Sequence, residues 1–181
     1  MTQEFVKFDK IPRLNRDCIV TEKIDGTNAQ IVFNEEAEML VGSRKRWIVP
    51  GDDNYGFAKW AHENRDDLFE ALGFGTHFGE WWGQGIQRGY GMDRKVFSLF
   101  NTTRWKDVPL PDGVDVVPVM YEGKFTTYHV RACLMDLRDE GSVASSGFMQ
   151  PEGVVVFHVA SQHLYKATLL NDEKHKGESH E

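Results

Sequence analysis

The sequence predicts one α+β domain, in which mainly antiparallel β-sheets are combined with interspersed helices. Three observations favour this class. Short apolar runs rich in β-branched residues recur along the chain, polar turn residues separate consecutive runs, and two segments carry apolar residues at helical spacing. Strands joined by short turns pair antiparallel, and helices then cover a face of the sheet. A length of 181 residues agrees with a single domain.

The first part of the chain predicts a strand and then a hairpin. Residues 18–23 are apolar and β-branched, and they run into the turn-type cluster Asp25-Gly26-Thr27. The runs 28–33 and 38–41 are separated only by a short polar stretch. We therefore expect these two runs to pair as an antiparallel hairpin.

The middle of the chain predicts a helix followed by two strands. In residues 54–72, apolar side chains at positions 57, 60, 61, 68, 71 and 72 form a stripe with a period of about 3.6 residues. Gly73 follows at a position where glycine commonly ends a helix. Residues 76–82 and 95–100, rich in aromatic and β-branched side chains, are expected to be strands.

The last part of the chain alternates a loop, a helix and two strands. Residues 108–118 combine prolines with Asp and Gly, which is typical of a loop or a sheet edge. Residues 128–137 place Val130, Cys133, Leu134 and Leu137 on one helix face. Strands are expected at 153–159 and 163–169. The expected domain spans residues 1–170, and residues 171–181 lack large apolar side chains, which predicts a polar tail.

Composition excludes several classes of protein. The chain carries 21 Lys and Arg against 28 Asp and Glu, a formal net charge of −7, so it does not coat nucleic acid by bulk charge, although a local basic site is compatible with this balance. No apolar run approaches the length of about 18 residues that a membrane helix needs, and the N-terminus has no apolar signal segment. Cys18 and Cys133 lie outside any CxxC pair, so we expect buried free thiols and a cytoplasmic location.

The glycine-rich segments do not match the common phosphate-binding loops. Gly73-Phe74-Gly75 and Gly83-Gln84-Gly85 begin like dinucleotide loops but lack the third glycine at the required offset. The sequence also has no P-loop pattern. If the chain handles phosphate, it does so by another arrangement.

Lys23 is the first candidate for chemistry. It ends an apolar strand directly before an Asp-Gly turn, in the segment Glu-Lys-Ile-Asp-Gly-Thr-Asn at residues 22–28. A nucleophilic lysine needs its ammonium form destabilised by low dielectric or by nearby cations. Most strand-end lysines are simply solvated, so the position alone leaves both interpretations open.

Residues 23–28 resemble the KxDG motif of the covalent nucleotidyltransferases, the superfamily of DNA ligases, RNA ligases and mRNA-capping enzymes. Asn28, two residues after the glycine, is similar to the KxDGxN form that is common in the RNA ligase branch. A bare KxDG recurs by chance, but further motifs follow in the family's order from about residue 20 to residue 168. The resemblance implies a ligase-type nucleotidyltransferase fold with Lys23 as the nucleophile, and with Glu22, Ile24 and Asn28 beside the nucleotide.

Two further segments resemble the phosphate and ribose motifs. In the basic run Gly42-Ser43-Arg44-Lys45-Arg46, the resemblance assigns a phosphate contact to Arg44 and, more weakly, to Arg46. Planar guanidinium groups suit phosphate oxygens, although a solvated loop would have the same composition. In Phe78-Gly79-Glu80-Trp81, the resemblance makes Glu80 the ribose ligand, because a carboxylate can accept hydrogen bonds from both ribose hydroxyls.

The strand at residues 95–101 resembles the one whose aromatic side chain stacks on adenine. Phe97 and Phe100 are both eligible, and successive strand residues face opposite sides, so at most one of them points into the pocket. We prefer Phe100 because it stands directly before the polar Asn101. Either choice implies an aromatic contact to the base.

The final motifs concern the metal and the phosphates. The segment Pro151-Glu152-Gly153-Val154-Val155-Val156 resembles EGxVV, whose glutamate helps to bind the metal, and we expect Asp25 and Glu152 to hold Mg²⁺ or Mn²⁺ largely through its water shell. The family usually ends with two lysines spaced K-x-K. Here only Lys166 matches, and Leu164 or Thr168 takes the other place. Lys174 or Lys176 is a candidate substitute.

The resemblance implies an ATP-dependent RNA ligase that joins 3′-hydroxyl and 5′-phosphate RNA ends through a covalent lysyl-AMP. We expect the RNA near Arg44, Arg46, Arg88 and Arg104. The residues after 168 are too few for an OB-fold or another accessory domain, so the expected form is an adenylyltransferase domain alone, monomeric and open to a protein partner for substrate recognition. Alternatives are a non-ligating nucleotide- or RNA-binding module, a capping-type guanylyltransferase and a DNA ligase.

Overall fold

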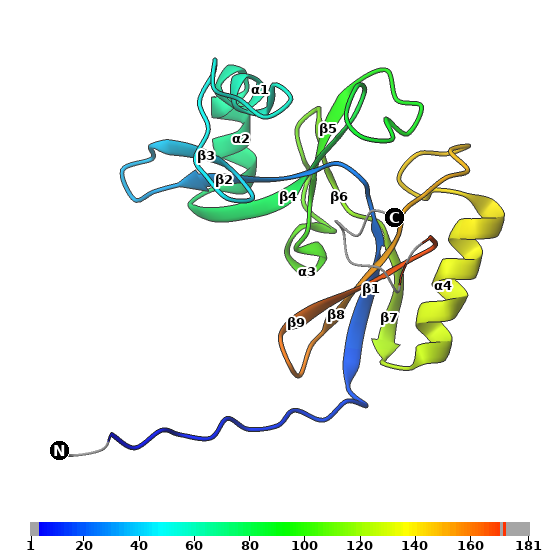
Figure 1. The fold of residues 1–181 in the computed structure, drawn as a ribbon. Coiled ribbons are helices and arrows are strands. Elements are labelled where there is room, and N and C mark those ends of the chain that lie inside the picture. The colour runs from blue at the N-terminus through cyan, green and yellow to red at the C-terminus, as the bar shows by residue number, and fades with distance from the viewer. Residues whose placement is uncertain (1–3, 171, 173–181) are drawn as a thin grey trace, which may run out of the picture.

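Two β-sheets form the frame of the fold in a computed structural model that describes residues 4–170 and 172 (Figure 1). Helix α4 lies beside one sheet, and helices α1 and α2 lie against the other. The element order is β1 (Asp17–Lys23), β2 (Thr27–Phe33), β3 (Met39–Ser43), α1 (Phe57–Glu63), α2 (Arg65–Leu72), β4 (Gly75–Gly83), β5 (Lys95–Leu99), α3 (Thr102–Trp105), β6 (Val114–Val116), β7 (Val119–Lys124), α4 (Thr127–Glu140), β8 (Gly153–His158) and β9 (His163–Thr168).

The first sheet has four antiparallel strands in the order β7-β1-β8-β9. Alternate residues of β1 point to opposite faces, and Cys18 and Val20 face α4. There they are buried with Cys133 and Leu137 of the helix. The opposite face of this sheet, which carries Lys23, is not covered by α4.

The second sheet has five strands in the order β3-β2-β4-β5-β6, and only the β5–β6 pair is parallel. Helices α1 and α2 cover one face. They bury Phe57 and Leu68 against Ile31, Trp81 and Phe97 of the sheet. The other face, which carries Glu80, stays free of these helices. A chain segment of three residues, between β1 and β2, links the two sheets.

The predicted fold class is confirmed, since the sheets are mainly antiparallel and helices are interspersed. The predicted hairpin is β2–β3, and the two last strands pair as β8–β9. The segment 108–118, predicted as a loop or an edge, contains β6 at the edge of its sheet. Strand β7 and the short helix α3 were not predicted.

The prediction of one helix over residues 54–72 is wrong. The structure has two helices separated at Asn64, whose φ of −111° and ψ of 18° depart from helical geometry. Both the backbone N–H and the side-chain amide of Asn64 donate to the carbonyl oxygen of Trp60. Asn64 thus ends α1 by donating hydrogen bonds to its last turn. The helix breaks there, although the apolar stripe continues into α2. Gly73 ends α2, as predicted.

The two cysteines are buried free thiols, as predicted. Burial raises the pKa of both thiols, which keeps them protonated at neutral pH. Among the described residues, no helix is both long enough and apolar enough to span a bilayer.

Candidate active site

Lys23 lies at the last position of β1, where β1 is paired with the first residue of β8. Its Nζ donates a 2.6 Å hydrogen bond to Oε2 of Glu152, the residue that precedes β8. The Lys23 side chain is 20% exposed and that of Glu152 only 8%. The pairing of β1 with β8 thus fixes the amine at the end of an inner strand, where it has one charged partner and an accessible side.

Lys166 lies on the same sheet face as Lys23. Lys23 of β1 is paired with Gly153 of β8, which is in turn paired with Thr168 of β9. Lys166 lies two residues before Thr168 on β9. Side chains two residues apart along a strand share a face. Leu164 and Thr168 therefore flank Lys166 on the face that carries Lys23. Lys174 and Lys176 lie outside the described residues.

Glu80 faces the site from the second sheet. It pairs with Asn28 across β4 and β2, and its two carboxylate oxygens accept hydrogen bonds from the side-chain amide of Asn28 (2.9 Å) and the backbone N–H of Gly26 (3.1 Å). Burial raises the pKa of Glu80 to about 7, although the charge of Lys23 and these two hydrogen bonds act in the opposite direction. Glu80 therefore titrates near neutral pH, within electrostatic reach of Lys23.

Gly26 allows the linker to pass close to β4. A Cβ atom at this position would lie 2.5 Å from the carbonyl oxygen of Trp81 and 2.7 Å from Cβ of Trp82. Both distances are too short for real contacts. The glycine of the KxDG motif is needed here for space, because its backbone N–H must reach Glu80.

Arg88 and Tyr90 hold Asp25 in place. Arg88 Nε donates to Oδ2 of Asp25 at 2.9 Å, and its guanidinium also donates to the carbonyl oxygens of Gln150 and Pro151. The hydroxyl of Tyr90 accepts the backbone N–H of Asp25. Arg88 was predicted to contact RNA; in the structure it ties the loop before Glu152 to the KxDG turn. Tyr90 was not predicted, although its place between Gly89 and Gly91 was visible in the sequence.

The two candidate phenylalanines lie on opposite faces of the second sheet. Phe97 is fully buried in the core beneath α1. The backbone N–H of Phe100 bonds to the carbonyl of Phe78, which continues the β4–β5 register and places Phe100 on the face of Glu80. Phe100 is 40% exposed there. Only Phe100 is accessible from the side of the site.

Glu22 and Ile24 are not on the open side. Glu22 lies on the face of β1 opposite Lys23, is 1% exposed, and accepts hydrogen bonds from the Ser142 hydroxyl and the N–H groups of Val143 and Ala144. The Ile24 side chain is buried with Trp82, Tyr90 and neighbours. Both side chains thus have structural contacts, and strand alternation turns that of Glu22 away from the face of Lys23. Whether these two residues contact the nucleotide stays a prediction.

The remaining predicted arginines are distributed around the molecule. Arg44 is exposed in the loop after β3. Arg46, expected to contact RNA, forms a bidentate pair with Asp52 at 2.5 and 2.8 Å. Arg104, expected to do the same, donates to the carbonyl of Leu72 and lies over the ring of Trp105. It belongs to α3, beside the helical layer, and so it is not brought to Lys23.

The sequence model of the RNA ligase family matches residues 16–168. The chain belongs to the RNA ligase family. No curated protein sequence matches it significantly.

Solved structures of Naegleria gruberi RNA ligase share the fold of this RNA ligase family member. A mutant with ATP and Mn has a TM-score of 0.63 at 18% identity, over 90% of this chain and 53% of that one. A structure with PPi has a TM-score of 0.60 at 18% identity, over 85% and 50%. A further mutant, with AMP and Mn, has a TM-score of 0.59 at 19% identity, over 90% and 53%. The chain thus spans about half the length of these structures.

The carboxylates of this RNA ligase family chain fit a hydrated divalent ion. Among the described residues, no group of three or more His, Cys, Asp or Glu side chains could enclose a metal. Asp25 and Glu152 each have one oxygen in an ion pair, with Arg88 and Lys23 respectively, which leaves one oxygen of each outside those pairs. Magnesium commonly keeps several waters and binds through one or two carboxylates plus substrate phosphates.

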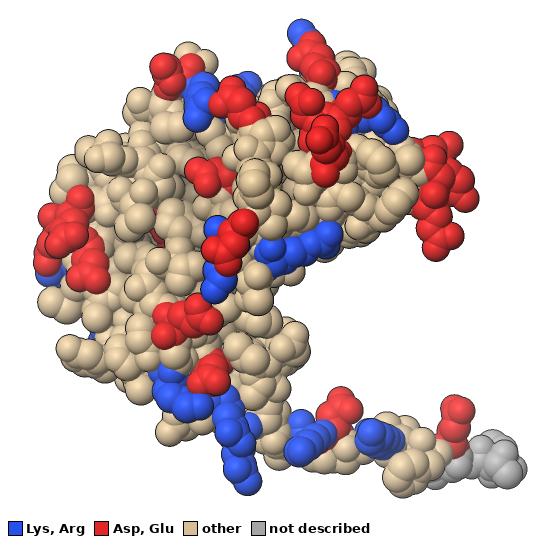
Figure 2. Space-filling model, turned by 180° about the vertical axis from the view of Figure 1, so that it is seen from behind, with Lys and Arg blue, Asp and Glu red and all other residues tan. Residues whose placement is uncertain are grey.

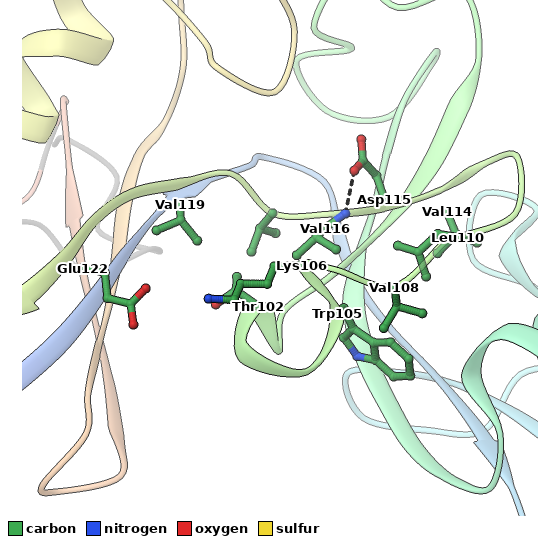
Figure 3. A pocket seen from close by; sticks show the side chains of 11 residues that line it. Thr102, Trp105, Lys106, Val108, Leu110, Val114, Asp115, Val116, Val119 and Glu122 are labelled. Atoms are coloured by element: carbon green, nitrogen blue, oxygen red, sulfur yellow. Dashed lines mark hydrogen bonds between the residues drawn. The ribbon is translucent and has the colours of Figure 1, made fainter.

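A cavity of about 490 Å³ lies away from this cluster, between α3, β6 and β7 (Figure 3). Its lining is largely apolar, with Trp105, Val114 and Val116 on one side, and it includes Lys106 and Glu122. None of its lining residues belongs to the Lys23 cluster. The predicted site residues of this RNA ligase family chain therefore gather at the junction of the two sheets and not around this cavity.

Proposed function

We propose that the protein is an ATP-dependent RNA ligase that joins 3′-hydroxyl and 5′-phosphate ends through a lysyl-AMP intermediate. One observation carries the proposal: in a chain of the RNA ligase family, the amine of Lys23 is held 2.6 Å from Glu152 and within electrostatic reach of Glu80. Residues 1–170 would form the adenylyltransferase domain.

In the first step, Nζ of Lys23 attacks the α-phosphorus of ATP. The attacking form is the neutral amine, reached when the ammonium gives one proton to solvent. A nitrogen–phosphorus bond then forms, the bond between the α-phosphorus and the pyrophosphate oxygen breaks so that pyrophosphate leaves, and Nζ gives a second proton to solvent. Glu152 orients the amine through its short hydrogen bond. Positioning and stabilisation of charge on the phosphate oxygens supply most of the rate in such transfers.

The nucleoside would lie against the second sheet. Glu80 accepts hydrogen bonds from the ribose hydroxyls, and Asn28, already bonded to Glu80, fixes the orientation of the carboxylate. Phe100, exposed on the same face, stacks on the base. The two sheets thereby hold different parts of one nucleotide.

In the later steps, AMP moves from Lys23 to the 5′-phosphate of RNA, and the 3′-hydroxyl then displaces AMP. Lys166, on the face of Lys23, and Arg44, exposed in the loop after β3, would contact the phosphates. Asp25 and Glu152 would hold Mg²⁺ or Mn²⁺, and the bound ion would stabilise negative charge on the phosphate oxygens. The ATP, AMP and Mn named for the Naegleria structures support this choice of substrate and metal.

Incubation of the protein with α-labelled ATP and Mg²⁺, followed by a denaturing gel, tests the first step. Label on the wild type and its loss in Lys23→Ala are expected. Lys124→Ala, which removes an exposed lysine of the same sheet, is the matched control and should keep the label. An unlabelled wild type, or label that persists in Lys23→Ala, would contradict the proposal. Competition with GTP separates the capping-type alternative, and we expect ATP to win.

One observation favours a second candidate, a nucleotide-binding module that does not ligate. Leu164 and Thr168, and not a second lysine, flank Lys166 on the site face. Sealing of nicked 5′-phosphorylated RNA by the purified protein excludes this module, and parallel DNA nicks test the DNA ligase alternative. We expect a monomer to seal RNA. We also expect the protein to keep its activity in a reducing, cytoplasm-like buffer, because both of its cysteines are free thiols.

A further inference from the structure

Residues 4–16 form an exposed arm that leaves the body at the start of β1 (Figure 1). The base of the arm is fixed: His158 Nε2 lies 2.7 Å from the carbonyl oxygen of Leu14, and the N–H of Phe125 bonds to the carbonyl of Arg16. Beyond this base, no side chain of residues 4–13 makes a hydrogen bond or ion pair with another described residue. The arm is thus anchored at one end and free of polar contacts along its length.

The arm carries a tripeptide repeat, apolar-x-basic, four times in succession. Its apolar positions are Phe5, Phe8, Ile11 and Leu14, and its basic positions are Lys7, Lys10, Arg13 and Arg16. An extended chain with three residues per turn rises about 9 Å per repeat and would align each set along its own edge. In that conformation the arm has one cationic edge and one apolar edge.

Both edges are open to a partner. The side chains of Phe5, Phe8 and Ile11 are 90%, 84% and 76% exposed, far more than large apolar residues in a folded chain usually are. The arm has four basic residues against two acidic ones, whereas the whole chain has a net charge of −7. Figure 2 shows Lys and Arg along the arm and a hollow between the arm and the lobe that holds β2 and β3. This local charge suits a polyanion.

We propose that this arm binds the RNA strand at a distance from the ligated end, with its cations on successive phosphates and its aromatic rings against unstacked bases. The proposal rests on the proposed RNA ligase function. Cations that track a backbone and aromatic rings that accept any base are the combination used for single strands without sequence preference. A protein partner would need the apolar edge but would gain little from a regular row of cations.

The distance along β1 gives the proposal a length requirement. The arm base lies at the Asp17 end of β1 and Lys23 at the other end, about 20 Å away at about 3.3 Å per residue. At about 3.4 Å per nucleotide, an RNA end at Lys23 needs about six nucleotides to reach the arm. An RNA of 20 nucleotides whose end is at Lys23 can therefore also contact the arm, and an RNA of four nucleotides held there cannot.

The test measures binding of 5′-phosphorylated RNA of 4 and 20 nucleotides by fluorescence anisotropy, over a series of salt concentrations, with the full chain. We expect the variant Lys7→Ala/Lys10→Ala/Arg13→Ala to bind the 20-mer at least about tenfold more weakly. Its slope of log K against log salt should be smaller by about 2, since each lost phosphate contact to a single strand contributes about 0.7. Binding of the 4-mer should not change.

A matched variant removes three exposed cations elsewhere, Lys59→Ala/Arg94→Ala/Arg138→Ala, and should bind both RNAs as the wild type does. A second variant, Phe5→Ser/Phe8→Ser, should weaken binding of the 20-mer without changing the salt slope, because it removes stacking and keeps the charges. Both arm variants should form the labelled Lys23 adduct with ATP at the wild-type rate.

Three results would overturn the proposal. The first is wild-type affinity and salt slope in the triple arm variant. The second is an equal loss for the 4-mer and the 20-mer. The third is a wild type that is dimeric by light scattering and becomes monomeric in the arm variants with RNA binding intact, which assigns the arm to a second copy. The adduct assay is independent of all three, so a failure of the proposed function is recognised separately, by an unlabelled wild type.

Discussion

Lys23 and Glu152 are 129 residues apart in the sequence, yet their side chains form a 2.6 Å hydrogen bond where β1 pairs with β8. The pair adds a side-chain contact to the backbone pairing that joins the KxDG and EGxVV segments. Because Lys23 remains 20% exposed, it can meet a substrate without the pair being dismantled first. The short contact therefore sets the direction of the amine as well as its charge environment.

Glu152→Gln should slow formation of the labelled lysine adduct. Gln can still accept a hydrogen bond but carries no charge, so it orients Lys23 less firmly and binds a divalent ion less well. We expect a rate between about 10-fold and 100-fold lower. Glu122→Gln, which changes an exposed glutamate on β7 of the same sheet, is the control and should be unaffected. A wild-type rate in a folded Glu152→Gln protein would remove Glu152 from the reaction.

The raised pKa of Glu80 predicts a pH-dependent stability. Burial raises this pKa from its ordinary value of 4.5 to about 7 in the folded protein, so the folded state holds a proton that the unfolded state releases between those values. This contribution is fully present below pH 4.5 and is lost as the pH rises to about 7. It amounts to about 3 kcal/mol in the free energy of unfolding.

Urea denaturation of the wild type and Glu80→Gln at several pH values measures this contribution. The difference in free energy of unfolding between the two proteins should change steadily from pH 4.5 to 7 and then level off. Gln also offers one acceptor oxygen where the ionised carboxylate offers two, to Gly26 and Asn28, so above pH 7 the variant should lack one of these two hydrogen bonds. A difference that is constant with pH would show that Glu80 titrates normally.

Glu22→Ala should reduce stability without removing the chemistry. The substitution leaves the N–H groups of Val143 and Ala144 without their acceptor, at a cost of about 1 to 3 kcal/mol for each one that stays buried. We expect a clear drop in midpoint temperature but near wild-type adduct formation per folded molecule at low temperature. Glu70→Ala, at an exposed position of α2, should change neither. Adduct loss with unchanged stability would return Glu22 to the nucleotide site.

Phe97→Ala and Phe100→Ala should have opposite effects. Phe97 is fully buried in the core, and its truncation should cost about 3 to 5 kcal/mol of stability. Phe100→Ala should cost little stability but lose about 1 to 3 kcal/mol of base stacking, which is a rise of about 5-fold to 150-fold in the Kd for ATP. Thermal denaturation and isothermal titration separate the two. Normal ATP affinity in Phe100→Ala would mean that another group supports the base.

Local sequence patterns were sufficient to predict most strands, because apolar runs and the turns that separate them depend on residues close in the sequence. They failed where tertiary contacts decide the backbone. The apolar stripe through residues 54–72 is continuous in the sequence. The chain nevertheless forms two helices, because Asn64 donates hydrogen bonds to the carbonyl oxygen of Trp60 and ends the first helix. Strand β7, whose residues are mostly exposed or half-buried, has no clear alternation and owes its conformation to pairing with β1.

The candidate site shows the same contrast between what local sequence patterns predict and what tertiary contacts decide. The motif residues Lys23, Glu80 and Glu152 do converge, because each lies at or next to a strand whose position follows from its motif. The side chain of Glu22 lies on the face opposite Lys23 because adjacent strand residues face opposite sides, and adjacency in a motif does not reveal which side is open. Arg46 was predicted from its place in the basic motif and Arg104 from its charge, and their structural partners, Asp52 and the Leu72 carbonyl, cannot be identified from either.

The division of the cluster between two sheets has an evolutionary consequence. Lys23, Glu152 and Lys166 belong to the four-stranded sheet, whereas Asn28, Glu80 and Phe100 lie on the face of the five-stranded one, and three residues connect the two groups. Under the proposed function, mutations that change the preferred nucleoside would fall on one sheet and mutations that change bond-making on the other. Specificity and reactivity could then change separately, so long as the short linker with its glycine is kept.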